Sequence, residues 1–226
     1  MSRYSLAAGA VAAPLFAVVA LAQAATRAGY DLTRHPVSLL SNGDLGWVQI
    51  TAFLLTGLLS IAAAPGTRAA LRGGRGERWA PRLLVLIGAG MLVAAVFRLD
   101  PADGFPVGTP LGTPATFSWH AIVHNLGGSL SFFSMMALCL VLARRFAADG
   151  QRAWAWTGRA CAVAFLVLLG WAFTGGRDGA LTLFVGVLLA WGWLAATSGV
   201  LLRRTSGSRP GSARMSATGK ATTLVA

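Results

Sequence analysis

Long apolar runs alternate with short polar segments along the chain. Each run is long enough to cross about 30 Å of hydrocarbon as an α-helix that rises 1.5 Å per residue. Alternation with a period of two is absent from these runs, so they predict helices rather than strands. The sequence therefore predicts an all-α fold, a polytopic membrane protein with a six-transmembrane-helix bundle, whose spans are Leu6–Ala24, Trp47–Ala64, Leu83–Leu99, His120–Ala143, Trp154–Phe173 and Leu181–Leu202.

The two ends of the chain need separate interpretation. Arg3 precedes the first run and Ala22-Gln23-Ala24 resembles a signal-peptide cleavage site. The apolar part of a signal peptide is about 7–15 residues, and this run is longer, so we expect an uncleaved first span; cleavage would leave five spans. We expect residues 1–204 to form the transmembrane domain. Residues 205–226 contain too few apolar side chains to fold, and we expect a disordered cytoplasmic tail.

Composition supports a membrane location. The chain is 55% hydrophobic and 12% charged, and its mean hydropathy is +0.64, whereas a soluble domain carries about 25% charged residues. Cys139 and Cys161 each lie within an apolar run and form no Cys-x-x-Cys motif, so we expect buried free thiols.

The distribution of charge predicts the orientation. With the N-terminus inside, the cytoplasmic side receives all of the nineteen basic residues except four, namely Arg27, Arg34, Arg98 and Arg177. The positive-inside rule then places both termini in the cytoplasm. The net charge of +12 would suggest nucleic acid for a soluble protein, but here the basic residues flank the spans. We therefore expect a multi-pass protein of the cell membrane, in contact with membrane lipid and not with nucleic acid; the sequence identifies no protein partner.

Two histidines open the fourth span. His120 and His124 are four residues apart, so they lie about one turn apart on one face of a helix. Imidazoles in this arrangement can share a metal ion or exchange a proton. The predicted topology puts them on the outer side of the membrane together with His35, Ser38 and Asp100. If neighbouring spans pack against each other, these groups can meet in one pocket.

A zinc ion is the cofactor that this set suggests. His35, His120 and His124 are the candidate metal ligands, with Asp100 as a substitute for His35. Three nitrogen or oxygen ligands leave a position for water, and zinc lowers the pKa of that water to about 7. In the alternative interpretation, the two imidazoles of the fourth span hydrogen-bond to Asp100 or to loop carbonyls, without metal.

Ser38 and Asp100 are the candidate catalytic residues. Ser38 would contact a substrate oxygen or act as a nucleophile activated by histidine; otherwise it makes a local turn or a helix cap before Trp47. Asp100 closes the third span, where a carboxylate opposes the helix dipole and needs compensation from Arg98, a histidine or a metal. Asp103-Gly104 is typical of a turn.

The sequence resembles the bacterial membrane proteins of the domain of unknown function 998 family. The resemblance extends from about Ala10 to Arg204 and rests on Tyr30-Asp31…His35-Pro36-Val37-Ser38, Gly46-Trp47-Val48-Gln49, Leu99-Asp100-Pro101 with Gly104-Phe105-Pro106, and His120-x3-His124. It implies a compact six-span protein and no particular activity. A looser similarity links Ser38, Asp100, His120 and His124 to the alkaline ceramidases and adiponectin receptors, which hold an intramembrane zinc but have seven spans and a His pair in the last span.

We therefore predict an integral membrane protein whose activity is a metal-dependent hydrolysis of a lipid or amphiphile at the outer leaflet. The metal-bound water would be the nucleophile and Ser38 a substrate contact. The alternative is a non-enzymatic membrane scaffold or a small transporter. A scaffold would tolerate loss of the histidine pair but not of the small residues that let helices approach closely, which are Gly88, Gly90, Gly127, Ser131, Gly192 and Ala196.

Overall fold

The computed structural model describes residues 2–175 and 178–207. Each predicted span corresponds to one helix, with only Leu83–Leu99 extending past the end of its helix at Val96, which confirms the all-α fold class. The helix α6 continues through Gly207, and residues 208–226 of the predicted tail lie outside the described part of the chain, as does Arg177. The elements are α1 (Ser2–Thr26), the short 3-10 helix η1 (Val37–Ser41), α2 (Gly46–Ala70), α3 (Trp79–Val96), α4 (Trp119–Ala148), α5 (Arg152–Phe173) and α6 (Gly179–Gly207).

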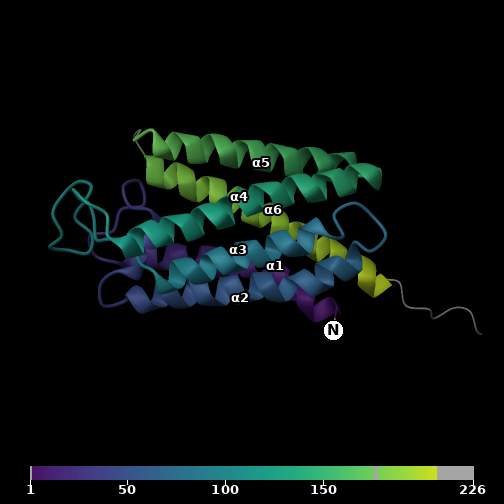
Figure 1. Cartoon of the computed structure of the whole chain (residues 1–226), viewed down its shortest axis with the longest axis horizontal. Helices are drawn as coiled ribbons and strands as arrows, with labels where there is room; N and C mark the ends of the chain where they lie inside the picture. Colours follow the sequence, from purple (N-terminus) through teal and green to yellow (C-terminus); the bar gives the residue numbers. More distant parts are fainter. Residues whose placement is uncertain (1, 176–177, 208–226) are drawn as a thin grey trace, which may run out of the picture.

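The helices form a closed ring in chain order. Each helix packs against the next one, and α6 packs against α1. Figure 1 shows the helices running roughly side by side, with the start of α1 and the end of α6 at the same end of the bundle. We call this the termini end and the opposite one the cap end. All six helices are long and apolar enough to span a membrane, so the chain is an integral membrane protein.

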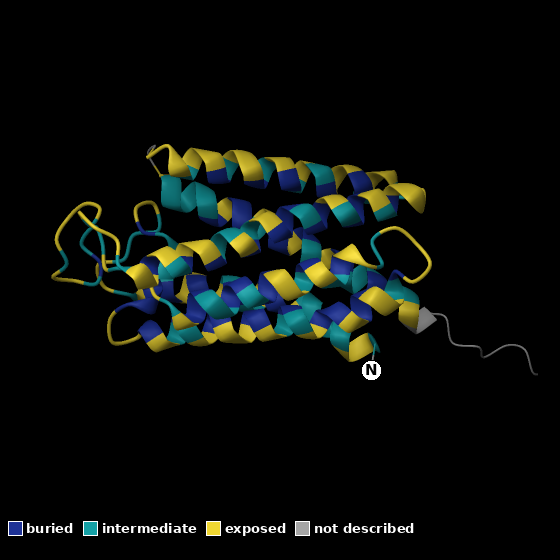
Figure 2. Cartoon of the chain, viewed as in Figure 1, coloured by how far each residue is buried: buried dark blue, intermediate teal, exposed yellow. Residues whose placement is uncertain are grey.

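The outward faces of the helices are apolar. Figure 2 shows exposed positions along the outer sides of the helices and buried positions on their inner sides. Large apolar side chains such as Leu58, Phe133 and Val167 are more than half exposed. In water such a surface would be unfavourable, whereas lipid tails match it. The helices therefore have the surface expected of contact with lipid.

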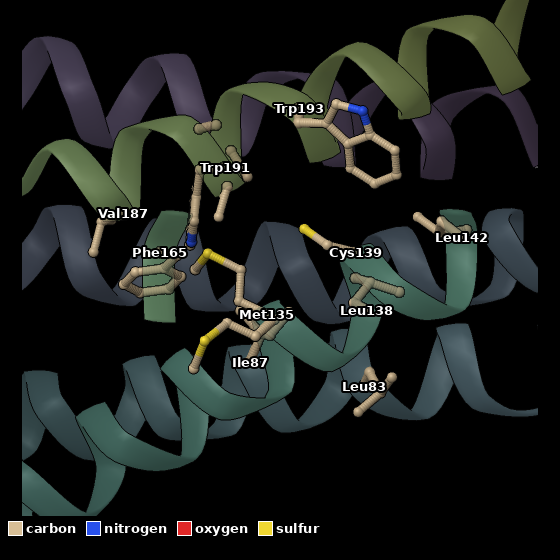
Figure 3. Close-up of a cluster of buried hydrophobic side chains, with 14 of the residues drawn as sticks. Leu83, Ile87, Met135, Leu138, Cys139, Leu142, Phe165, Val187, Trp191 and Trp193 are labelled. Atoms are coloured by element: carbon tan, nitrogen blue, oxygen red, sulfur yellow. The ribbon is translucent and has the colours of Figure 1, made fainter. Parts of the chain in front are cut away.

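The buried core inside the ring receives side chains from all six helices. Figure 3 shows Met135 and Leu138 of α4 facing Trp191 of α6. Trp193 of α6 donates its indole N–H to Thr157 Oγ1 of α5 at 3.0 Å. Both tryptophans lie in the middle of α6, away from the ends of the span, where an aromatic belt is usual.

Small residues allow α3 and α4 to approach closely. A methyl group added to Gly90 would overlap the carbonyl oxygen of Gly127 on α4. One turn further along, Ser131 Oγ donates to the carbonyl of Ile87 at 2.9 Å. By contrast, a methyl group on Gly192 would meet nothing within 4 Å. The predicted packing role therefore holds for Gly90 and Gly127 and not for Gly192.

A serine of α1 compensates for the backbone hydrogen bond that a proline removes from α2. Pro65 lies inside α2 and has no N–H to donate. Ser5 Oγ accepts the N–H of Gly66 at 2.8 Å and donates to the carbonyl of Ala62. The Ser5 hydroxyl thus bonds two backbone groups of the α2 turn that contains Pro65. Inside a membrane no water is available, so backbone polar groups need partners within the protein. This contact fixes α1 against α2 near the termini end.

Candidate functional site

Two loops fold together over one end of the bundle. We call residues 27–45 and 97–118 the cap. Its small core is formed by Phe105, only 1% exposed, with Leu39 and Leu40. The Arg27 guanidinium lies over the Phe105 ring, 5.2 Å from its centroid, and donates to the carbonyls of Leu40 and Asn42. The cap is therefore an ordered structure with an interior of its own.

The predicted Asp103-Gly104 turn is confirmed. Ala102 and Phe105 exchange both backbone hydrogen bonds, at 3.0 and 2.9 Å. The φ angles of Asp103 and Gly104 are +50° and +87°, which is the pattern of a type I′ turn and explains the glycine. This turn presents the Asp103 carbonyl and carboxylate to the other loop of the cap.

His35 joins the two loops of the cap. Its Nδ1 accepts the backbone N–H of Asp31 at 2.9 Å, so Nδ1 carries no hydrogen. The imidazole hydrogen is then on Nε2, which donates to the carbonyl of Asp103 at 2.9 Å. Tyr30 donates its hydroxyl to the carbonyl of His35 at 2.7 Å. Both nitrogens of this buried imidazole are used by the backbone.

An ion pair strengthens the same junction. Arg34 Nε and Nη2 donate to the two carboxylate oxygens of Asp103, at 3.1 and 2.8 Å. The backbone N–H of Gly112 donates to this carboxylate at 2.9 Å. The Arg34 hydrogen bonds, followed by the one from Gly112, hold the pKa of Asp103 below its ordinary value. Hydrogen bonds from Thr33 similarly lower the pKa of Asp31.

The two histidines of α4 have different surroundings. His120 is exposed and stacks on Trp119, with ring centroids 3.7 Å apart. His124 is only 3% exposed, and its Nδ1 lies 2.7 Å from the carbonyl of Phe97 and 3.1 Å from that of Ala94. Because both partners are acceptors, Nδ1 carries the hydrogen. His124 thus satisfies carbonyls at the end of α3, as the metal-free interpretation expects for this residue.

Asp100 holds the start of α4. The third helix ends at Val96, so Asp100 does not oppose the dipole of α3, and that part of the sequence prediction is wrong. Asp100 Oδ2 instead accepts the N–H of Ser118 at 2.7 Å. Ser118 is the N-cap of α4, with its Oγ accepting the N–H of Ala121 at 3.2 Å. A carboxylate at a helix N-terminus is favourable.

The structure does not gather the predicted zinc ligands around one point. His35 is saturated by the cap backbone, His120 is stacked at the surface, and His124 is bound to α3. Among the described residues, no group of three His, Cys, Asp or Glu side chains could hold a metal ion. Zinc binding therefore stays a prediction, to which the geometry of His35, His120 and His124 adds no support.

Ser38 and His124 do share a cavity. We call it the cap-end cavity; its volume is about 70 Å³ and it lies inside the bundle directly beneath the cap. Ser38 of η1 and His124 line the part next to the cap. Ser131 lines the cavity deeper in the bundle, and the rest of the lining is mainly apolar, with Phe132, Phe184 and Trp191. None of the described residues hydrogen-bonds His124 Nε2, so this nitrogen is a free acceptor at the cavity.

Sequence reasoning missed several polar groups of the interior. Gln23 of α1 donates its amide to Gln49 of α2 at 2.7 Å, and both side chains are buried. Trp191 lines the cap-end cavity from the centre of α6. A signal was present in each case, because two glutamines near span ends and a mid-span tryptophan are unusual within apolar runs.

The fold and the cavity define a six-span integral membrane protein with a capped internal site. The family described as "Protein of unknown function (DUF998)" matches residues 10–222. The chain therefore belongs to the DUF998 family, as the resemblance of its motifs implied. No curated protein and no solved structure matches it.

Proposed function

We propose that this protein binds a lipid-like amphiphile in the cap-end cavity. The observation that carries the proposal is the polarity of the cavity lining. Ser38 and His124 supply polar groups next to the cap. The wall below them is mainly apolar and aromatic, and the one hydroxyl in it, that of Ser131, donates to the carbonyl of Ile87. The cavity, at about 70 Å³, would hold only part of an amphiphile. A polar group of the ligand would lie at His124 Nε2, the adjoining apolar part would contact Phe132 and Phe184, and the rest of the chain would extend out of the cavity into the lipid.

The cap would face the outside of the cell. The basic residues concentrate at the termini end, in the loop between α2 and α3 and around the start of α5, and the positive-inside rule assigns this end to the cytoplasm. The ligand then belongs to the outer leaflet of the cell membrane. A reporter fused after Gly207 is expected to be active in the cytoplasm; activity only outside would contradict this orientation.

We place the entrance of the cavity between α4 and α6, beside Gly128. This glycine lines the cavity, and a methyl group added to it would meet nothing within 4 Å. Ala180 and Leu183 line the opposite edge on α6. The lack of a side chain at Gly128 would let an acyl chain enter sideways between the helices.

Binding of a fluorescent lysophospholipid by the purified protein tests the proposal. A methyl group at Gly128 meets nothing within 4 Å, and a leucine would extend from this open position, so Gly128→Leu is expected to weaken binding several-fold at an unchanged melting temperature. Gly192→Leu is the matched control, because Gly192 also has open space around it and does not line the cavity. Equal binding by Gly128→Leu and wild type would contradict the proposal.

Hydrolysis of the bound amphiphile is a second candidate function, favoured by one observation. The carbonyls of Ala94 and Phe97 hold His124 with Nε2 free, and Ser38 lines the same cavity. A histidine oriented in this way can take the proton of a serine hydroxyl as the oxygen attacks an ester carbonyl, and can return it to the alcohol oxygen as the ester bond breaks. Water, activated by the same imidazole, would then cleave the acyl-serine to the free acid and restore the hydroxyl. Ser38→Ala is then expected to abolish ester cleavage while binding persists. Zinc-dependent hydrolysis would instead be lost on metal removal.

A further inference from the structure

A second cavity continues the first along the axis of the bundle. This termini-end cavity has a volume of about 30 Å³. On α4 its lining begins at Leu138, one turn beyond Met135 of the cap-end cavity. On α6, likewise, Val187 lines the cap-end cavity, and Ser198, further along the helix, lines the termini-end cavity. The two cavities therefore lie end to end inside the ring of helices.

Trp191 separates the two cavities. It is the residue that lines both of them among the described residues. Figure 3 shows its ring extending from α6 toward α4. The side chain is only 6% exposed, and its Nε1 has no hydrogen-bond partner among the described residues. A buried donor without a partner costs about 1–3 kcal/mol, so we expect this N–H to donate to a bound water or solute.

A second unpaired polar atom lies at the same level of the bundle. Along one face of α2, Phe53 lines the cap-end cavity and Ser60 lines the termini-end cavity. Thr56 lies between them on this face, fully buried, and its Oγ1 has no partner in the described part of the chain. Two unsatisfied polar atoms therefore mark the level at which the cavities meet.

Water fits these cavities in size and in chemistry. One water molecule needs roughly 10–15 Å³ of such volume, so both cavities have room for at least one. In the termini-end cavity, Ser60 donates to the carbonyl of Thr56 and Ser198 to that of Leu194. Each hydroxyl oxygen keeps lone pairs for further donors. In the cap-end cavity, His124 Nε2 is a further acceptor.

We infer that the two cavities form a hydrated path for water-sized polar solutes through the bundle, and that Trp191 is the partition that closes it. The hydroxyls of Ser60 and Ser198 line the inner half of the path, and His124 lines the outer half. Water donates to the lone pairs of these groups and accepts the indole N–H of Trp191. This inference does not rest on amphiphile binding, because it requires only water in the cavities.

Radiolytic hydroxyl-radical labelling in ¹⁸O water tests whether the cavities are hydrated. Met135 and Met136 are adjacent on α4 and both are buried, but only Met135 lines a cavity. Because radicals form from water, Met135 and Trp191 are expected to be labelled several-fold faster than Met136. Equal labelling of the two methionines would overturn the hydrated path. A lipid-facing side chain such as Phe133 provides the water-free baseline.

Solute flux in proteoliposomes tests the partition. Trp191→Ala is expected to raise the permeability to water or to a small polar solute such as formamide several-fold over wild type. Trp191→Phe keeps an aromatic ring in place and is expected to leave the permeability low, which separates loss of the partition from loss of the fold. If folded Trp191→Ala protein, with a normal melting profile, is no more permeable than wild type, the partition is refuted. Failure of lysophospholipid binding would leave both results unchanged.

Discussion

His35 Nε2 donates to the carbonyl oxygen of Asp103 across 2.9 Å, and this bond ties together two loops that are far apart in the chain. A second bond, from the Asp31 N–H to Nδ1, fixes the neutral tautomer. The histidine that the sequence suggested as a zinc ligand therefore has a sufficient structural role in the cap.

Removing this imidazole is expected to loosen the cap. His35→Ala leaves the Asp31 N–H without a partner and leaves the Asp103 carbonyl with only the longer bond from Arg34 Nη2, at 3.3 Å. An unpaired buried group costs about 1–3 kcal/mol. The variant should show faster amide hydrogen exchange at both loops and a lower melting temperature in detergent. His120→Ala is the control, because this exposed side chain stacks only on its own helix and the Phe97 ring. Identical exchange in His35→Ala and wild type would mean that the cap does not depend on His35.

Acid is expected to open the cap through its carboxylates. The pKa values of Asp31 and Asp103 are lower in the folded cap than their ordinary value of 3.8. Their contribution to stability is therefore complete above that value and is lost as the pH falls through the folded-state pKa. Pepsin cleavage of the cap loops should rise steeply as the pH is lowered toward about 2.

Asp103→Asn tests the cause of this pH dependence. The variant lacks the charge that Arg34 holds, so its cap should already be cleaved at the upper end of the pepsin range and should respond less to further acidification. Asp44→Asn is the matched control, since the Asp44 side chain makes no hydrogen bond to a described residue of the cap. Parallel pH profiles for wild type and Asp103→Asn would refute the role of the Arg34–Asp103 pair.

The close contact of α3 with α4 predicts a sharp difference between two glycines. A methyl group on Gly127 would press against Val93 and the carbonyl of Gly90, whereas one on Gly192 has open space. Gly127→Ala is expected to destabilise the bundle by about 1–3 kcal/mol, the usual range for overpacking. Gly192→Ala should not destabilise the protein and can raise its melting temperature slightly, because alanine is the better helix former. Similar melting temperatures for the two variants would contradict the described packing.

The bridge between α1 and α2 gives a further prediction. Ser5→Ala removes the hydroxyl that accepts the Gly66 N–H and donates to the Ala62 carbonyl next to Pro65. Loss of these hydrogen bonds costs about 1–3 kcal/mol, so the melting temperature of the detergent-solubilised protein should fall. Replacing Pro65 as well, in Ser5→Ala/Pro65→Ala, restores an N–H at position 65 and should recover part of the loss. If the double variant recovers no stability, the Ser5 hydrogen bonds do not compensate for Pro65.

The spans and the family were predictable from the sequence, because each depends on local patterns. The apolar runs predicted the helices, and the Asp103-Gly104 pair predicted the turn. The partners of His35 were not predictable, because they are backbone groups of Asp31 and Asp103 and leave no trace in residue types. The position of Asp100 was misjudged for a related reason, since the apolar run continues past the last helical residue, Val96.

The proposed site was only partly predictable. Ser38 and His124 were singled out from the sequence, and they do line one cavity. The contribution of Trp191 depends on the ring closing between α6 and α1, which brings the middle of the last helix to the centre of the bundle. Residue spacing along one chain segment carries no information about that closure.

Photo-crosslinking of a membrane-embedded amphiphile tests the central proposal most directly. A lysophospholipid with a diazirine in its acyl chain would be activated with the protein in vesicles, and the modified residues mapped by mass spectrometry. We predict labelling at the apolar wall of the cap-end cavity, at Phe132, Met135 and Phe184, and its suppression in Gly128→Leu. Labelling confined to outward-facing side chains such as Leu58 and Phe133, and unaltered by Gly128→Leu, would contradict the proposed binding site.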